Sequence, residues 1–517
     1  MNAKNNAMEA KNPPAVASTT NVTQSPPVSS SYSIYTRKEQ WILVTLVACA
    51  GLFSPLPANI YFPAIPTLTS VFNRSVEDMN LTVTIYLIFQ GINGDGDPPL
   101  YLVCLSILTA SCIGLALCLT SAYWVLLLLR AVQAGGCAST ITLGAGVIRN
   151  IAAADERGGY FGMFNLGPML APCIGPAIGG ALSDYLGWTS IFWFLAICSG
   201  CCLLLIFVCF PETLRAIVGD GSIPPKNPLS RPLLRIVGRH NKGNENQLDV
   251  ITSQQSPAAA HAEPSPTKRH GSNPFKLLLY PDVALTLAYT GIIHAVNYTI
   301  TTTISSSFAD IYSSLSETAL GLCYLAGGGG MILGSTITGK LLNRDYTKIK
   351  KRFAERSNNA NDDIGSDGNE NGVPIEYARL RMRPVLLLLL VGCVLAWGRL
   401  LERKVHLAVP MVLQVILLTT LLGYTSISIL NATMTLMIDI AKAQGSGVIA
   451  CTNLVRCSLS AILVSFIDSA TRRLGFGWTY VLLGAICALI LPLIFVEMKM
   501  GPQWRAKRAC NEEKQSD

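Results

Sequence analysis

Charged residues are scarce in this sequence: Asp, Glu, Lys and Arg together make up 14% of its 517 residues. An average globular protein contains about 25% of these residues. The scarcity therefore argues against a soluble enzyme, a nucleic-acid-binding domain and a disordered scaffold. We expect neither catalysis nor a nucleic-acid partner.

Patterns for metal binding and disulfide pairing are also lacking. The 16 cysteines lie inside or at the ends of apolar stretches, except Cys510 in a polar tail. No Cys-x-x-Cys pair stands beside histidines at metal-ligand spacing, so we expect no metal and no cofactor. The placement also excludes a small secreted domain held together by disulfides.

The first 36 residues have no apolar core, so we expect no cleavable signal peptide. This segment is rich in Ser, Thr, Asn, Pro and Ala. Such a composition buries too little apolar surface to fold, and residues 1–36 are predicted to be a disordered tail.

The sequence does contain many apolar stretches of about 20 residues, the length of helix that crosses a bilayer. Twelve candidate spans can be counted, at residues 41–63, 79–92, 99–119, 123–146, 159–183, 189–210, 282–304, 317–341, 384–401, 408–436, 446–468 and 478–497. The predicted fold class is an all-α polytopic membrane protein with two bundles of six helices. Two related halves are typical of transporters, whose substrate path lies between them.

Polar connectors divide the chain into predicted domains. These are a disordered tail (1–36), an N-terminal six-helix bundle (37–210), a cytoplasmic linker (211–275), a C-terminal six-helix bundle (276–497) with a cytoplasmic insert (343–383), and a C-terminal tail (498–517). Most Lys and Arg residues lie in the tails, the linker and the insert. The positive-inside rule then places both termini in the cytoplasm.

The second span is unusually short. Its 14 residues, 79–92, reach only about 21 Å as a helix, and an acidic connector from Asn93 to Pro99 follows. Either this span is a partial helix covered by its neighbours, or a segment is missing from the chain. We favour the missing segment, because a cytoplasmic connector is expected to be basic.

Two arginines lie within predicted spans. A charge at that depth costs several kcal/mol unless it faces water or a partner. Gln133 shares a helical face with Arg130, and Asn453 lies one turn from Arg456. We predict that these four residues belong to a transport cavity; the alternative is an arginine clamped to helix carbonyls.

The fifth span carries a dense pattern of glycine and proline. Prolines remove backbone donors and bend a helix, while glycines let another helix approach closely. We predict a specialised bend at a helix interface, a hinge motif. Its residues are Gly167, Pro168, Pro172, Gly175, Pro176, Gly179 and Gly180.

The seventh span offers a polar stripe: His294, Asn297, Tyr298 and Thr301, at helical spacing. Histidine titrates near pH 6.5, so His294 is a candidate proton carrier, and a packed, hydrogen-bonded histidine is equally expected. No Asp or Glu lies at the centre of a span. Asn73-Arg74-Ser75 matches the acceptor pattern for glycosylation, in the first predicted outside loop.

Several of these segments resemble one known family. Ser54–Pro66, with Asn59 and Tyr61, resembles the first-span signature of the fungal twelve-span drug:proton antiporters of the major facilitator superfamily. Leu129–Gly136 is similar to their fourth-span arginine motif, and the glycine–proline pattern resembles their antiporter signature. Three further segments are similar, the last two to the quinidine-resistance-like branch: Pro211–Arg215, Pro374–Arg381 and Asn453–Cys457.

The resemblance implies the major facilitator fold and export of amphipathic compounds, driven by inward proton flow. It further implies that Arg130 takes part in proton coupling and that Gly167–Gly180 forms the conformational hinge. One departure is the loop Gly-x-x-x-Asp-x-x-Gly-Arg-Arg between spans two and three, which is replaced by Asn93–Pro99. Because that loop stabilises one end of the transport cycle, its loss opens the alternative of a transport-incompetent variant.

We therefore predict a proton-coupled exporter of amphipathic drugs or small metabolites, acting as a monomer in the lipid bilayer of the plasma membrane, with the vacuolar membrane as the alternative. Tyr61, Tyr86 and Tyr298 are expected to contact cationic substrates through their rings. The alternative within this class is an exporter of organic acids, because two intramembrane arginines without a central carboxylate favour an anion. A receptor-like protein is less favoured, because the C-terminal tail is short.

Overall fold

The computed structural model describes residues 33–91, 99–118, 122–152, 156–213, 218, 278–311, 315–359, 375–403, 409–440 and 445–516. The predictions for most of the tail 1–36, for most of the linker 211–275 and for the connector that follows the second span lie outside these residues. The predicted domain boundaries therefore stay predictions.

Every regular element among the described residues is a helix. The first group comprises α1 (Arg37–Leu52), α2 (Leu56–Asn59), the 3-10 helix η1 (Phe62–Ala64), α3 (Ile65–Phe72), α4 (Val76–Gly91), α5 (Pro99–Ala116), α6 (Tyr123–Ala138), α7 (Thr140–Ile151), α8 (Arg157–Leu186) and α9 (Thr189–Cys209). The second comprises α12 (Pro281–Ile311), α13 (Glu317–Asn359), α14 (Ile375–Leu380), α15 (Arg383–Glu402), α16 (Val409–Ile440), α17 (Gly445–Ala488) and α18 (Leu491–Ser516). The predicted all-α fold is confirmed.

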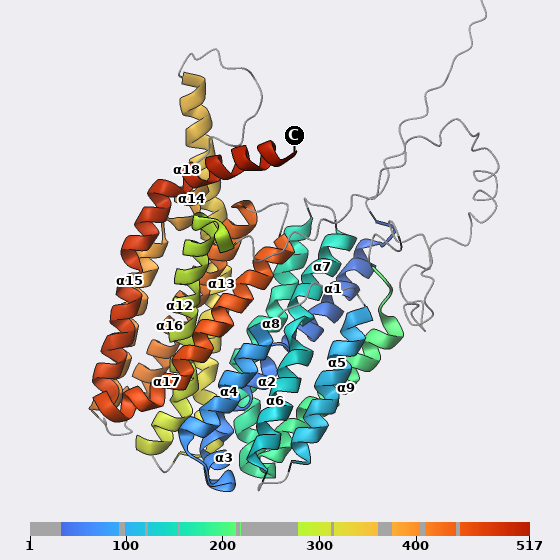
Figure 1. Cartoon of the computed structure of the whole chain (residues 1–517), viewed down its shortest axis with the longest axis vertical. Coiled ribbons are helices and arrows are strands. Elements are labelled where there is room, and N and C mark those ends of the chain that lie inside the picture. Colours follow the sequence, from blue (N-terminus) through green and yellow to red (C-terminus); the bar gives the residue numbers. More distant parts are fainter. Residues whose placement is uncertain are drawn as a thin grey trace, which may run out of the picture.

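Nine helical segments of the described chain are long and apolar enough to cross a membrane. One of them, Gly447–Arg505, passes through Gly475, whose φ of 77° breaks the helix, so that it contains the last two predicted spans. In Figure 1 the chain reverses its direction there, at the lower left. Two shorter helices, α4 and α5, account for the second and third predicted spans, so each of the twelve falls on a helix.

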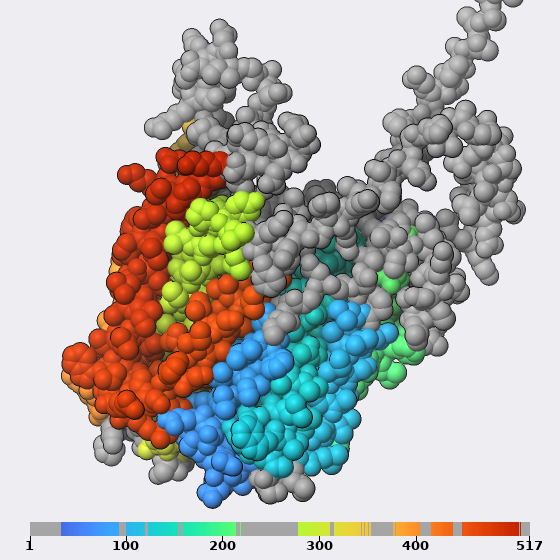
Figure 2. All heavy atoms as spheres, in the orientation of Figure 1, coloured from blue at the N-terminus to red at the C-terminus, as the bar shows by residue number. Residues whose placement is uncertain are grey.

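The two groups of helices pack against each other along two seams. One seam joins α8 to α13, and the other joins α4 to α17. Figure 2 shows the second seam on the surface, where the blue atoms of α4 lie against the orange atoms of α17. The substrate path that the sequence predicts would open between these seams.

The first predicted span is broken because its sequence contains prolines at positions 55, 57 and 63. Proline cannot donate a backbone hydrogen bond, and an interior proline disrupts the preceding turn. The capping box of Thr36 and Glu39 starts α1, which ends at Leu52, and the chain continues through the short helices α2 and η1 into α3. The break exposes backbone and side chains around Asn59 to the centre of the molecule.

Both seams are closed at the end of the molecule farthest from the C-terminus. Across the α4–α17 seam, Asn80 donates a hydrogen bond from its amide to Asp468, and the Arg472 guanidinium lies 3.6 Å from the Glu77 carboxylate. Across the α8–α13 seam, the Thr318 hydroxyl donates to the Asp184 carboxylate over 2.7 Å. These contacts hold the two groups of helices together at the end that the sequence predicts to be extracellular.

Candidate functional site

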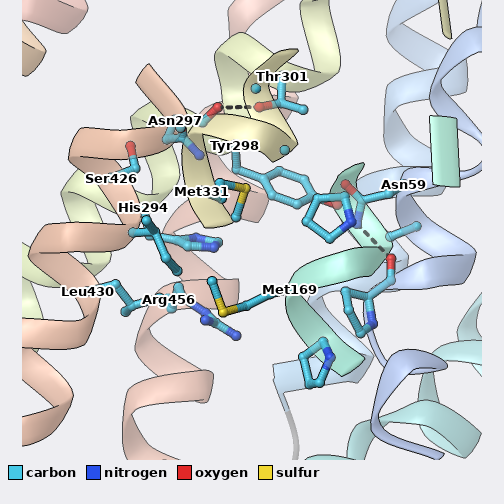
Figure 3. A pocket seen from close by; sticks show the side chains of 18 of the residues that line it. Asn59, Met169, His294, Asn297, Tyr298, Thr301, Met331, Ser426, Leu430 and Arg456 are labelled. Carbon is cyan, nitrogen blue, oxygen red and sulfur yellow. Dashed lines mark hydrogen bonds between the residues drawn. The ribbon is translucent and has the colours of Figure 1, made fainter. Parts of the chain in front are cut away.

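A cavity of about 310 Å³ lies between the two groups of helices. Both groups contribute to its wall, which Figure 3 shows from close by. Nine residues selected from the sequence line it: Asn59, Pro168, Pro172, His294, Asn297, Tyr298, Thr301, Asn453 and Arg456. The structure thus brings together residues that are up to about 400 positions apart in the chain.

The described wall of this cavity is mostly apolar and carries a single formal charge. Arg456 is the only Lys, Arg, Asp or Glu among the lining residues that the structure describes. Thioether and aliphatic groups face it, including Met169 from α8 and Met331 from α13 (Figure 3). Flexible methionine side chains adapt to apolar groups of different shapes. The cavity therefore suits a small amphipathic molecule.

The polar stripe predicted on the seventh span lies on α12 and faces the cavity. His294 and Tyr298 stack with ring centroids 5.8 Å apart, and the His294 Nδ1 atom lies 3.0 Å from the Ser460 hydroxyl. In Figure 3 the Tyr298 ring points across the cavity toward Asn59, while His294 lies on the side of Arg456. Both expectations for His294 stay open, because it is hydrogen-bonded and also lines the cavity.

Arg130 lies outside the cavity, contrary to the prediction. Its side chain is fully buried on α6, where Nη1 donates to the Pro57 carbonyl over 3.0 Å and to the Gln133 amide oxygen over 2.9 Å. Its guanidinium carbon lies 3.8 Å from the centre of the Tyr61 ring and 5.5 Å from that of Tyr86. The geometry is that of the alternative, an arginine clamped to a helix carbonyl.

The rings of Tyr61 and Tyr86 consequently do not line the cavity either. Both side chains are fully buried, and Arg130 already occupies a face of each ring. Of the three tyrosines expected to contact a cationic substrate, only Tyr298 is a lining residue. The sequence could not show this, because Arg130 and the tyrosines lie on different helices.

The glycine–proline motif forms part of the continuous helix α8 and lies at interfaces on two sides. A Cβ atom added at Gly167 or Gly179 would collide with the carbonyl of Ala48 or of Ile60, in the α1–α3 segment. A Cβ atom at Gly180 would collide with the Glu317 carbonyl of α13. The predicted placement at a helix interface is therefore observed, and Gly175 and Pro176 take part in the same contacts.

Two polar features of the structure were not predicted from the sequence. Gln90 lines the cavity and bonds to both groups of helices, although its position at the end of a short span gave no signal. Away from the cavity, Arg383, Tyr289 and Glu497 form a fully buried cluster that joins α15, α12 and α18. The sequence did contain an indication of this cluster, because Arg383 and Glu497 each lie at the end of an apolar stretch.

Comparison with known sequences decides the family. Residues 47–463 match the sequence pattern of the Major Facilitator Superfamily. This chain belongs to that superfamily. The resemblance found in the sequence is thereby confirmed, and the match extends through both groups of helices.

Relatives within the superfamily are fungal transporters. The chain is 31% identical to Citrate exporter 1 of Aspergillus niger, over 92% of this chain and 89% of that protein. It is also 31% identical to the MFS antiporter QDR2 of Candida albicans, over 90% of each. Among solved structures, a D-xylose-proton symporter superposes with a TM-score of 0.59 at 12% identity, covering 87% of this chain and 97% of that one. That likeness concerns the fold.

Proposed function

We propose that this chain is a secondary active transporter that exports small amphipathic organic molecules by alternating access. One observation carries the proposal: the mostly apolar cavity with one charge lies between two groups of helices that meet along two seams. Rocking of one group against the other exposes such a cavity to each side in turn. Family membership supports a transporter rather than an enzyme.

Proton antiport is the proposed driving force. The relative from Candida albicans is named an antiporter. His294 is a lining residue that can bind and release a proton, and it stands beside the permanent charge of Arg456. Protonation of His294 would place two cations in the cavity and so favour the release of a cationic substrate or the retention of an anionic one.

A second candidate is export of organic acids, and the charge of the cavity favours it. An amphipathic anion would find a guanidinium and no competing carboxylate among the described lining residues, whereas a cation would find the rings of Tyr298 and Tyr324 but no opposite charge there. The relative from Aspergillus niger is named a citrate exporter. We therefore place the organic acids first among the substrates to be tested.

Replacing Arg456 with Gln should separate the two candidates. A charge-assisted hydrogen bond contributes about 1.5–3 kcal/mol, so we expect the KM for an organic anion such as citrate or benzoate to rise at least tenfold. Uptake into inside-out vesicles under an imposed pH gradient measures this. An unchanged KM for anions would favour a drug exporter. So would a protein that transports no anion and whose KM for quinidine falls in the variant. If the uptake rate does not depend on the pH gradient, transport is not coupled to protons.

The orientation of the chain is tested through Asn73. This residue is exposed in the turn after α3, with a left-handed φ of 49°, in the sequence Asn73-Arg74-Ser75. We propose that both termini face the cytoplasm and that the protein is a monomer of the plasma membrane. Treatment of the protein produced in yeast with an endoglycosidase should then increase its electrophoretic mobility, and Asn73→Gln should abolish the shift. A shift that survives in the variant would place the glycan elsewhere.

A further inference from the structure

A chain of hydrogen bonds leads from the charged residue of the cavity to the opposite group of helices. Arg456 donates from Nη2 to the Asn453 Oδ1 atom over 2.8 Å, within α17. Asn453 donates from Nδ2 to the Gln90 carbonyl of α4 over 2.9 Å. The Gln90 amide donates in turn to the Ser54 carbonyl over 2.7 Å, at the break between α1 and α2. This series of hydrogen bonds therefore begins at Arg456 in the cavity wall and ends at Ser54, in the group of helices on the other side of the seam.

The middle link joins the two groups of helices at a buried point of the α4–α17 seam. Gln90 lies in the last described turn of α4, and Asn453 of the other group donates to its carbonyl. Gln90 is 8% exposed and Asn453 is 9% exposed, so the bond has little access to water. Losing it would leave the buried Asn453 amide without this partner.

Arg456 sets the orientation of the Asn453 amide. An amide has one oxygen and one nitrogen, and the guanidinium can only donate, so it holds the oxygen on its own side and turns the nitrogen toward α4. Within the described part of the chain, the Arg456 Nε atom is buried without a hydrogen-bond partner. A guanidinium with an unused buried donor, in a wall whose described residues include no carboxylate, is ready to bind an acceptor group of a ligand.

We propose that Asn453 and Gln90 are positioning residues that couple occupation of the cavity to the α4–α17 seam. This inference rests on the proposed function. An anionic group of the substrate draws the Arg456 guanidinium away from Asn453, which frees the amide to rotate. The Gln90 carbonyl then loses its donor, and the seam opens more readily at this point. The substrate itself thus weakens the contact that keeps the two groups of helices together.

The seam can be followed with a single new cysteine. A Cβ atom on Gly91 would lie 3.1 Å from the Cβ atom of Cys457, a little closer than the separation of about 3.5–4.5 Å found in disulfides. In the variant Gly91→Cys, the rate of disulfide formation with Cys457 under mild oxidation reports how closely α4 and α17 approach. Mass spectrometry of the linked peptides from the full-length protein in detergent gives this rate.

In that background, the addition of benzoate or citrate should slow cross-linking about fivefold, the effect expected from loss of one hydrogen bond. Asn453→Leu should slow it to a similar extent without any solute, and the solute should then have no further effect. Asn453→Asp, which keeps the acceptor for Arg456 but loses the donor to Gln90, should behave in the same way. It covers the case in which the leucine variant fails to fold.

The matched control is Asn80→Leu, which removes a hydrogen bond from the other end of the same seam. It should leave the effect of benzoate on cross-linking intact, whatever it does to the basal rate. If both Asn453 variants cross-link at the parental rate and respond to benzoate as the parent does, the inference is overturned. The cross-linking rates measured without benzoate or citrate test the series of hydrogen bonds even if the protein transports no anion. The proposed function and this inference can therefore fail separately.

Discussion

Replacing Gly180 with Ala should lower the transport rate at least tenfold. Gly180 lies on α8 in the seam with α13, and the added Cβ atom would overlap the Glu317 backbone carbonyl. A backbone carbonyl cannot move aside as the tip of a side chain can, so the two helices have to separate. Overpacking of this kind costs about 1–3 kcal/mol. Since the seam has to close and open in each cycle, we expect the rate of substrate efflux from vesicles to fall.

Gly162→Ala is the control in the same helix. Its Cβ atom would meet no other atom within 4 Å, and the residue is exposed. Alanine favours a helix over glycine by about 1 kcal/mol, so this variant should be as stable as the parent or slightly more stable. Comparable loss of transport in both variants would show that the helix rather than the seam is sensitive. Gly321→Ala, which meets the Pro176 carbonyl from the α13 side, should reproduce the effect of Gly180→Ala.

Replacing Arg383 with Gln should destabilise the protein by about 3–5 kcal/mol, the cost of leaving a buried charge without its partner. Arg383 is fully buried at the start of α15 and donates a hydrogen bond to the Tyr289 hydroxyl. Glu497, which is 1% exposed and accepts a hydrogen bond from Thr286, interacts with both residues. The thermal unfolding midpoint of the purified protein measures this loss.

Arg381→Gln is the control for that change, because Arg381 is exposed two residues earlier in the chain. It should leave the unfolding midpoint unchanged. The double variant Arg383→Gln, Glu497→Gln should recover part of the stability, because it also removes the unpaired carboxylate. If the double variant is no more stable than Arg383→Gln, the two charges do not compensate each other and this reading of the cluster fails.

The first span illustrates what local sequence can predict and what it cannot. Residues 41–63 were predicted as one span, whereas the structure breaks it between α1 and α2, where its prolines lie. The sequence also pointed to Asn59, which does line the cavity. The same stretch gave no means to place Tyr61, because the partner that covers its ring, Arg130, comes from α6.

The two intramembrane arginines had the same signal in the sequence and different fates in the structure. Each was an isolated charge in an apolar stretch, with an amide three residues away. Arg130 meets the carbonyl that the broken first span leaves free, and it is fully buried. Arg456 meets only an amide of its own helix and lines the cavity. Neighbouring helices decided between them, and a single sequence does not state which helices are neighbours.

By itself, the sequence determined that the chain is a helical membrane protein, because the number and length of apolar stretches depend only on local composition. It also determined the family, the glycine-rich interface of α8 and several residues of the cavity wall, because short motifs carry this information. Tertiary structure alone decided that Arg456 is the single formal charge among the described residues of the cavity wall and that Asn453 bonds to α4 across the seam. Those properties arise when helices far apart in the chain come within a few ångströms, where burial and hydrogen-bond geometry are fixed.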